Sequence, residues 1–85
     1  MAFLYILQSE STRRFYIGST TDLERRLAEH ARAQTPSAAK RGPWRLVYRE
    51  VFPTLSAARQ RERRLKAWKS HQAIAKLVAA ESSGG

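Results

Sequence analysis

The feature that most constrains the fold of this chain is a continuous apolar run at its start, from Ala2 to Gln8. Such a run, followed by the polar residues Ser9 to Thr12, predicts a buried central strand and then a turn. The run is far too short to span a bilayer and has no signal-peptide features, so we expect no membrane and a cytoplasmic location. The 85 residues include no cysteine, so apolar and aromatic side chains must form one core without disulfides or thiolate zinc sites.

Five further elements are predicted from periodicity and from the residues that start and stop helices. They are strands over residues 14–19 and 44–52, and helices over residues 21–33, 55–69 and 70–78. A capping box beginning at Thr21 opens the first helix, and Thr54 and Ser70 cap the other two. In the third strand, alternation places Leu46 and Tyr48 on one face and Val47 on the other.

The element order ββαβαα predicts an α+β fold, with a three-stranded antiparallel sheet flanked by helices. No repeat and no long linker divides the sequence. Residues 1–80 are therefore predicted to form a single domain, and residues 81–85 a disordered tail.

The formal net charge of +9, with a pI near 11.1, indicates a polyanionic partner. DNA is the partner we expect, with RNA as an alternative, although a generally basic surface or an acidic partner protein would also fit. Gly18 is predicted to allow either close backbone approach or a β-bulge. A set of basic residues is predicted to contact phosphates. The basic residues are Lys40, Arg41, Arg59, Arg61, Arg63 and Arg64.

Glu62 is the only acid in the basic segment from Arg59 to Lys69. Helical periodicity places it on the apolar stripe that Ala58, Leu65 and Trp68 form, so its carboxylate points toward the sheet while the arginines face solvent. A carboxylate in such a place must be paired, hydrogen-bonded or bound to a metal. The two hypotheses are a metal ligand and a buried salt bridge with an arginine of another element.

Arg26 lies one helical turn before His30, at the edge of the packed side of the first helix. It is either a phosphate-binding arginine that stabilises charge in a transition state, or an ordinary solvated side chain. Tyr5 and Tyr16 fall on strands that we expect to pair. They are either half-buried core residues or groups that position or deprotonate a water.

Together these residues resemble the GIY-YIG nuclease superfamily, in particular its small stand-alone bacterial branch and the N-terminal domain of excision-repair nucleases. The first motif is degenerate, with Phe3-Leu4-Tyr5 in place of Gly-Ile-Tyr, whereas Tyr16-Ile17-Gly18 is intact. The segment from Ser19 to His30 is similar to the arginine helix of the family. The resemblance extends over roughly residues 2–78, although Ser19 stands where some repair relatives have lysine.

The resemblance implies a nuclease that hydrolyses phosphodiester bonds with Mg²⁺ or Mn²⁺. It assigns catalytic roles to Tyr5, Tyr16, Arg26, His30 and Glu62, with Glu62 as the metal ligand. We expect Tyr5, Tyr16, Arg26 and Glu62 to line one concave surface, with Glu62 on the same side of the sheet as Tyr16.

Two functions remain open from the sequence. The first is a small structure-selective DNA endonuclease of the repair or recombination type, and the second is a basic nucleic-acid-binding module with little or no catalysis. So short a chain has no room for a separate sequence-reading domain, so specificity must come from nucleic-acid shape, a homodimer or a partner protein. The sequence does not identify the preferred nucleic-acid structure or the pathway.

Overall fold

A computed structural model describes residues 1–31 and 44–83, with only the backbone described for residues 30, 31 and 81–83. The strands are β1 (Ala2–Ser9), β2 (Phe15–Thr20) and β3 (Trp44–Phe52), and the helices are α1 (Leu23–Ala31), α3 (Leu55–Ala67) and α4 (His71–Ser83). This order, ββαβαα, confirms the predicted α+β class.

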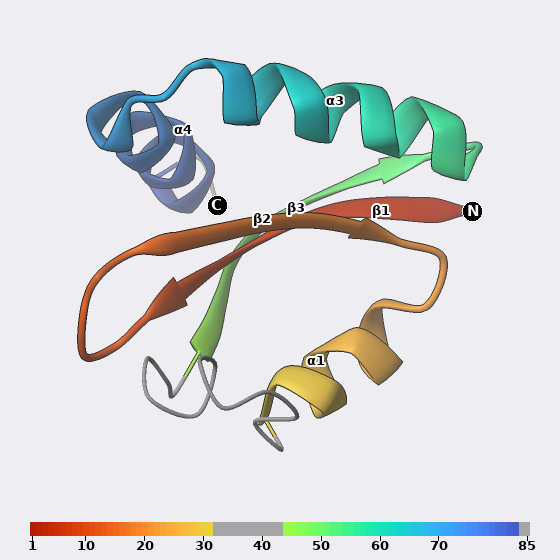
Figure 1. The fold of residues 1–85 in the computed structure, drawn as a ribbon, viewed down its shortest axis with the longest axis horizontal. Helices are drawn as coiled ribbons and strands as arrows, with labels where there is room; N and C mark the ends of the chain where they lie inside the picture. Colours follow the sequence, from red (N-terminus) through yellow and green to blue (C-terminus); the bar gives the residue numbers. More distant parts are fainter. Residues whose placement is uncertain (32–43, 84–85) are drawn as a thin grey trace.

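The three strands form one antiparallel sheet in the order β2-β1-β3, so the apolar run at the start of the chain is the central strand, as predicted. Helix α1 covers one face of the sheet, and α3 and α4 cover the other (Figure 1). Within the described residues, β2 pairs only with β1 and forms one edge of the sheet.

Two apolar clusters, one on each face, hold these layers together. On the face toward α3 and α4, the buried residues are Leu4, Ile6, Tyr48, Leu65 and Ile74. On the face toward α1, they are Tyr5, Leu7 and Leu23. Because β1 contributes side chains to both clusters, nearly all of it must be apolar, which is why the run has no polar alternation.

A β-bulge in β3 changes the predicted pattern of that strand. Ile6 pairs with Tyr48 but Leu7 pairs with Leu46, so Val47 is an extra residue in the register. Leu46 consequently packs beside Tyr5 and Leu7, whereas Val47 packs beside Tyr48. The prediction that Leu46 shares a face with Tyr48 is wrong, because strict alternation does not survive a bulge.

The helix starts agree with the sequence in two cases out of three. The hydroxyls of Thr54 and Ser70 accept hydrogen bonds from the third following backbone N–H, which confirms both as N-caps of α3 and α4. In α1 the capping residue is Asp22 rather than Thr21, because the Asp22 carboxylate accepts from the backbone N–H of Arg25 at 3.1 Å.

The helix ends differ more from the prediction. Helix α4 continues to Ser83, into the segment 81–85 that was expected to be a tail. The alanines before this segment, Ala79 and Ala80, are strong helix formers that favour continuation. Trp68, at the C-terminus of α3, is 43% exposed. The prediction that it belongs to the buried apolar stripe of this helix is therefore wrong. In the described part of the chain, no helix is long and apolar enough to cross a membrane.

Candidate active site

Tyr5 and Tyr16 lie side by side on the face of the sheet toward α1. Their ring centroids are 6.3 Å apart with an interplanar angle of 27°, and their hydroxyls are hydrogen-bonded. The ring of Trp44 approaches Tyr16 edge-on at 6.2 Å. Tyr5 is 2% exposed and Tyr16 43% exposed, so Tyr16 is the phenol that water or a substrate can reach.

Gly18 pairs with Tyr5 and lies under the Tyr5 ring. A Cβ atom at position 18 would lie 2.5 Å from the Tyr5 hydroxyl oxygen and 2.6 Å from Cζ, far inside van der Waals contact. The glycine is therefore required by the tyrosine. Close approach of a nucleic-acid backbone, for which Gly18 was predicted, is a separate hypothesis that this contact does not support.

The pKa of Tyr5 is raised to about 12. Burial is the largest cause, and Tyr16 and the Glu62 carboxylate add to it, while the Arg26 guanidinium acts in the opposite direction. At neutral pH Tyr5 is therefore a protonated hydrogen-bond donor. The same shift shows that Tyr5 lies within electrostatic reach of both Arg26 and Glu62.

Glu62 projects from α3 and is hydrogen-bonded on both carboxylate oxygens. The Ser19 hydroxyl donates to Oε1 at 2.6 Å, and the Lys66 ammonium donates to Oε2 at 2.6 Å. The Glu62 side chain is 21% exposed. Burial acts to raise its pKa, but the hydrogen bonds from Lys66 and Ser19 and the charges of Lys66 and Arg59 outweigh burial and lower it. The carboxylate is thus an anion at neutral pH.

This arrangement bears on the two hypotheses for Glu62. Its ionic partner is a lysine of its own helix, 55% exposed, and not a buried arginine of another element. The arginine–carboxylate pair that joins two elements is made instead by Arg61 and Glu50, with two hydrogen bonds of 3.1 and 3.2 Å. The ion pair between elements that one hypothesis assigned to Glu62 is therefore formed by Glu50.

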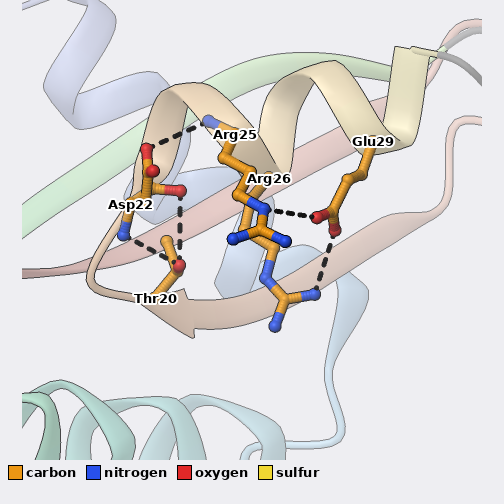
Figure 2. A network of polar contacts seen from close by, with 5 residues as sticks. All are labelled: Thr20, Asp22, Arg25, Arg26 and Glu29. Carbon is orange, nitrogen blue, oxygen red and sulfur yellow. Dashed lines mark hydrogen bonds and ion pairs between the residues drawn. The ribbon is translucent and has the colours of Figure 1, made fainter.

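Arg26 extends from α1 toward Glu29 (Figure 2). Its side chain is 51% exposed. Its Nη1 atom lies 3.3 Å from Oε2 of Glu29, and Nε of Arg25 lies 3.3 Å from the other oxygen of the same carboxylate. Thr20 and Asp22 fix the start of this helix, since the Asp22 backbone N–H donates to the Thr20 hydroxyl. The Glu29 carboxylate is thus shared by the two arginines, and the Arg26 guanidinium remains half exposed.

The candidate residues approach one another across strand β2, and not on a single face of the sheet. Tyr5 and Tyr16 lie on the α1 face, whereas Ser19 and Glu62 lie on the α3 face, because adjacent residues of β2 point in opposite directions. The expectation that Glu62 lies on the same side of the sheet as Tyr16 is wrong, and with it the single concave surface on which the catalytic interpretation of the sequence depended. Because β2 is an edge strand, a ligand at its free edge would reach both faces.

The remaining predicted site residues differ in how far they are exposed and in whether the structure describes them. Lys40 and Arg41 lie outside the described residues, and so does the side chain of His30, whose backbone belongs to α1. Arg59, Arg63 and Arg64 are exposed on α3, as a phosphate-binding role requires. Arg61 is only 27% exposed and is bound by Glu50, so it is the member of the predicted set least available to a phosphate.

A metal at this site would have few protein ligands. In residues 1–31 and 44–83, no group of three or more His, Cys, Asp or Glu side chains comes together. Glu62 alone nevertheless fits a hard divalent cation of the Mg²⁺ type, which commonly takes one or two carboxylates and completes its shell with water and substrate phosphate. The hydrogen bond from Ser19 orients this carboxylate from the sheet.

Three contacts of the site were not predicted. The pairs Glu62–Lys66 and Arg26–Glu29 have the helical spacings of four and three residues, so the sequence carries a signal for both. The contact between Ser19 and Glu62 joins residues 43 positions apart, and only the packing of α3 on β2 creates it. Ser19 therefore orients the Glu62 carboxylate. In the sequence, Ser19 was notable only because some repair relatives have lysine at this position.

Known proteins are similar to this chain over most of its length. A family model described as the GIY-YIG catalytic domain matches residues 1–75. A UPF0213 protein of Haloquadratum walsbyi is 39% identical over 67 residues, which are 78% of this chain and 74% of the relative. A UPF0213 protein of Staphylococcus saprophyticus is 35% identical over 77 residues, which are 89% of this chain and 92% of the relative.

A solved structure is also similar over most of the chain. It is the solution NMR structure of the UPF0213 protein BH0048 from Bacillus halodurans, with a TM-score of 0.59 and 33% sequence identity. The likeness covers 94% of this chain and 85% of that one. The names of these relatives state a family and no activity.

Proposed function

We propose, from the premise that this chain belongs to the GIY-YIG catalytic domain family, that it is a divalent-metal-dependent endonuclease that hydrolyses DNA phosphodiester bonds. Domains of this family are generally endonucleases, so a nuclease-type function is the coarse expectation. The observation that carries the finer proposal is the placement of two candidate residues beside neighbouring positions of edge strand β2. The Tyr5 hydroxyl lies over Gly18, and the Glu62 carboxylate accepts a hydrogen bond from Ser19. The charges of Arg26 and Glu62 both act on the Tyr5 phenol. Because β2 is an edge strand, a single ligand bound along its free edge can contact residues on both faces of the sheet.

The chain's own residues suit distinct roles in such a reaction. Arg26 is half-exposed and cationic, so its guanidinium can hold the scissile phosphate and stabilise the charge that develops on it. Tyr16 is exposed enough to position the attacking water, and Tyr5 stays protonated and orients Tyr16 through their hydrogen bond. Removal of the proton from water falls to Tyr16, which is 43% exposed, or to His30.

Glu62 is the residue that would hold the divalent cation. When bound, such a cation withdraws charge from the phosphate and stabilises the leaving oxygen. The same carboxylate accepts hydrogen bonds from Lys66 and Ser19. Since the Lys66 side chain is 55% exposed, its ammonium can turn to solvent and release the carboxylate to a divalent cation, while the Ser19 hydrogen bond keeps the carboxylate in place.

A specific observation also favours a second candidate, a basic nucleic-acid-binding module with little cleavage. The Lys66 ammonium lies 2.6 Å from Oε2 of Glu62 and neutralises the charge on which metal binding depends. If this pair persists in the presence of Mg²⁺, the protein binds nucleic acid without cutting it.

Selectivity for branched, single-stranded or damaged DNA would distinguish a repair or recombination enzyme from a general nuclease.

The variant Glu62→Gln tests the proposal. We expect it to retain DNA binding and to lose Mg²⁺- or Mn²⁺-dependent nicking of a supercoiled plasmid, because an amide has no charge for a hard cation. Stability should fall by no more than about 1 kcal/mol, since the ionic partner is an exposed lysine. The measurements are plasmid nicking, DNA binding and thermal unfolding.

Glu10→Gln, at an exposed acid in the turn after β1, is the matched control and should nick like the wild type. Wild-type nicking by Glu62→Gln would rule out the metal-ligand role. A wild-type protein that binds DNA but nicks none of a panel of supercoiled, single-stranded and branched substrates would establish the second candidate.

A further inference from the structure

A cleft of about 280 Å³ lies beside β2, where α3 ends and α4 begins. Its floor is apolar and consists of Phe15, Ile17, Leu65 and Ile74. Leu65 and Ile74 are only 1% and 5% exposed, so they form a fixed surface, while Phe15 and Ile17 remain partly open to solvent. The imidazole of His71 stacks on Phe15, with ring centroids 4.7 Å apart.

The rim of the cleft is basic. Arg14, Lys66 and Lys69 line it together with His71, and no acid does. Arg14 and Lys69 are exposed. They have no ion pair among the described contacts, which involve other cations. Cations gathered around an apolar floor repel one another unless an anion joins them, so an anionic ligand with an apolar part is the complementary occupant.

The cleft is continuous with the candidate active site through one residue. Lys66 lines the cleft, and its ammonium binds Glu62. Ile17, on the floor, and Ser19, which binds Glu62, lie on the same face of β2. A strand held at Glu62 would therefore reach the cleft by following β2 toward Phe15.

We propose that this cleft is a subsite for one nucleotide of a single nucleic-acid strand that flanks the cleavage point. Arg14 and Lys69 bind the phosphate, and the base lies on the apolar floor beside the Phe15–His71 stack. A base can enter only when it is unstacked, so the subsite selects a single-stranded flank over continuous duplex. The direction of the strand rests on the proposed function, but binding in the cleft does not.

A substitution of Lys69 by glycine can test the proposal without destabilising the fold. Its backbone has a φ of 48°, in the left-handed region that glycine adopts without strain. Lys69→Gly therefore removes the charge while keeping or raising the melting temperature. Lys76→Gln, at an exposed lysine of α4 that does not line the cleft, is the matched control for net charge.

The probe is a labelled oligothymidylate of about six nucleotides, titrated in EDTA so that no cleavage occurs. We expect Lys69→Gly to weaken binding roughly threefold and the double variant Arg14→Gln/Lys69→Gly roughly tenfold. The salt slope should fall by about 0.7 for each phosphate that the variant no longer neutralises. Equal effects of Lys69→Gly and Lys76→Gln would show general electrostatics and overturn the subsite. Wild-type binding by the double variant would overturn it as well.

A second probe tests the apolar floor. An oligonucleotide of the same length and charge, with abasic sites in place of its bases, should bind the wild type roughly fivefold or more weakly. That loss should be smaller in the double variant. Equal binding of the abasic and normal strands would show that no base enters the cleft.

These outcomes separate the two proposals. If the double variant loses binding in EDTA but the wild type never nicks DNA with Mg²⁺, the subsite stands and the nuclease function fails. If Lys69→Gly binds and nicks like the wild type, the nuclease function stands and the subsite fails.

Discussion

Tyr5 and Gly18 behave as one unit, since the ring of the first occupies the space that a side chain on the second would need. This explains physically why the second motif ends in glycine. The glycine is not needed for a special backbone angle, because no glycine in the described residues has a positive φ. The need arises from the pairing of β1 with β2, which sets these two residues opposite each other.

We expect Gly18→Ala to lower stability by roughly 1–3 kcal/mol, because the new methyl group collides with a Tyr5 ring that is 2% exposed and packed. Thermal unfolding measures the loss. In a Tyr5→Leu background the same change should cost much less, since the shorter side chain leaves the space free. Equal costs in both backgrounds would contradict the contact.

Ser19 shows what residue-scale reasoning misses. Its neighbours in the sequence give no sign that its hydroxyl donates to a carboxylate on α3. Tyr5, Tyr16, Arg26 and Glu62 could be selected from sequence because their residue types and spacings resemble a known motif. A serine in a strand has no such signal until the helix is packed above it.

At the scale of elements, α3 divides its basic residues between two tasks. Arg59, Arg63 and Arg64 face solvent, while Arg61 turns under the helix to bind Glu50 on β3. Glu50 also accepts a hydrogen bond from the hydroxyl of Tyr48. The periodicity of α3 predicted the buried positions of Ala58 and Leu65 correctly, but it treated all four arginines alike.

Arg61→Gln should therefore destabilise the fold by roughly 1–3 kcal/mol, because it removes the partner of a partly buried carboxylate. Arg63→Gln, on the exposed side of the same helix, should change stability by no more than about 0.5 kcal/mol. For duplex DNA we expect the reverse order, with Arg63→Gln reducing the salt slope by about 0.9 and Arg61→Gln leaving it nearly unchanged. Denaturant unfolding and salt-dependent binding measure both, and equal effects of the two variants would refute the division.

At the scale of the whole molecule, two buried phenols link stability to alkaline pH. Burial, together with Tyr16 and Glu62, raises the pKa of Tyr5 to about 12. Burial and the hydrogen bond to Glu50 raise the pKa of Tyr48 to about 12. In the unfolded chain both titrate near 10.

These two pKa values predict that folding stability decreases as the pH rises above 10. Below pH 10 both phenols are protonated in the folded and unfolded chains, and stability does not depend on them. Between pH 10 and 12 the unfolded chain ionises first, so stability falls, by up to about 3 kcal/mol for each group. We expect a cooperative alkaline unfolding transition in that interval, measured by circular dichroism. Tyr5→Phe should make the fall shallower, and stability that stays flat to pH 12 in the wild type would contradict both shifts.

The sequence by itself determined the class and order of the elements, the central strand, two of the three helix caps, and the family to which the chain belongs. These properties are local, since an apolar run, a capping hydroxyl or a motif is contained within a few neighbouring residues. The net charge belongs here as well, because it is a sum that needs no coordinates.

The tertiary structure alone decided where the bulge in β3 falls, that Arg61 is the arginine of α3 that binds Glu50, and that Glu62 binds Ser19. Each depends on which residues meet across strands or between α3 and the sheet, and sequence periodicity describes only one element at a time. Periodicity correctly indicated that Glu62 faces the sheet, but it could not show which face of the sheet that is. Tyr5 and Glu62 lie on opposite faces of the sheet and are nevertheless within electrostatic reach of each other.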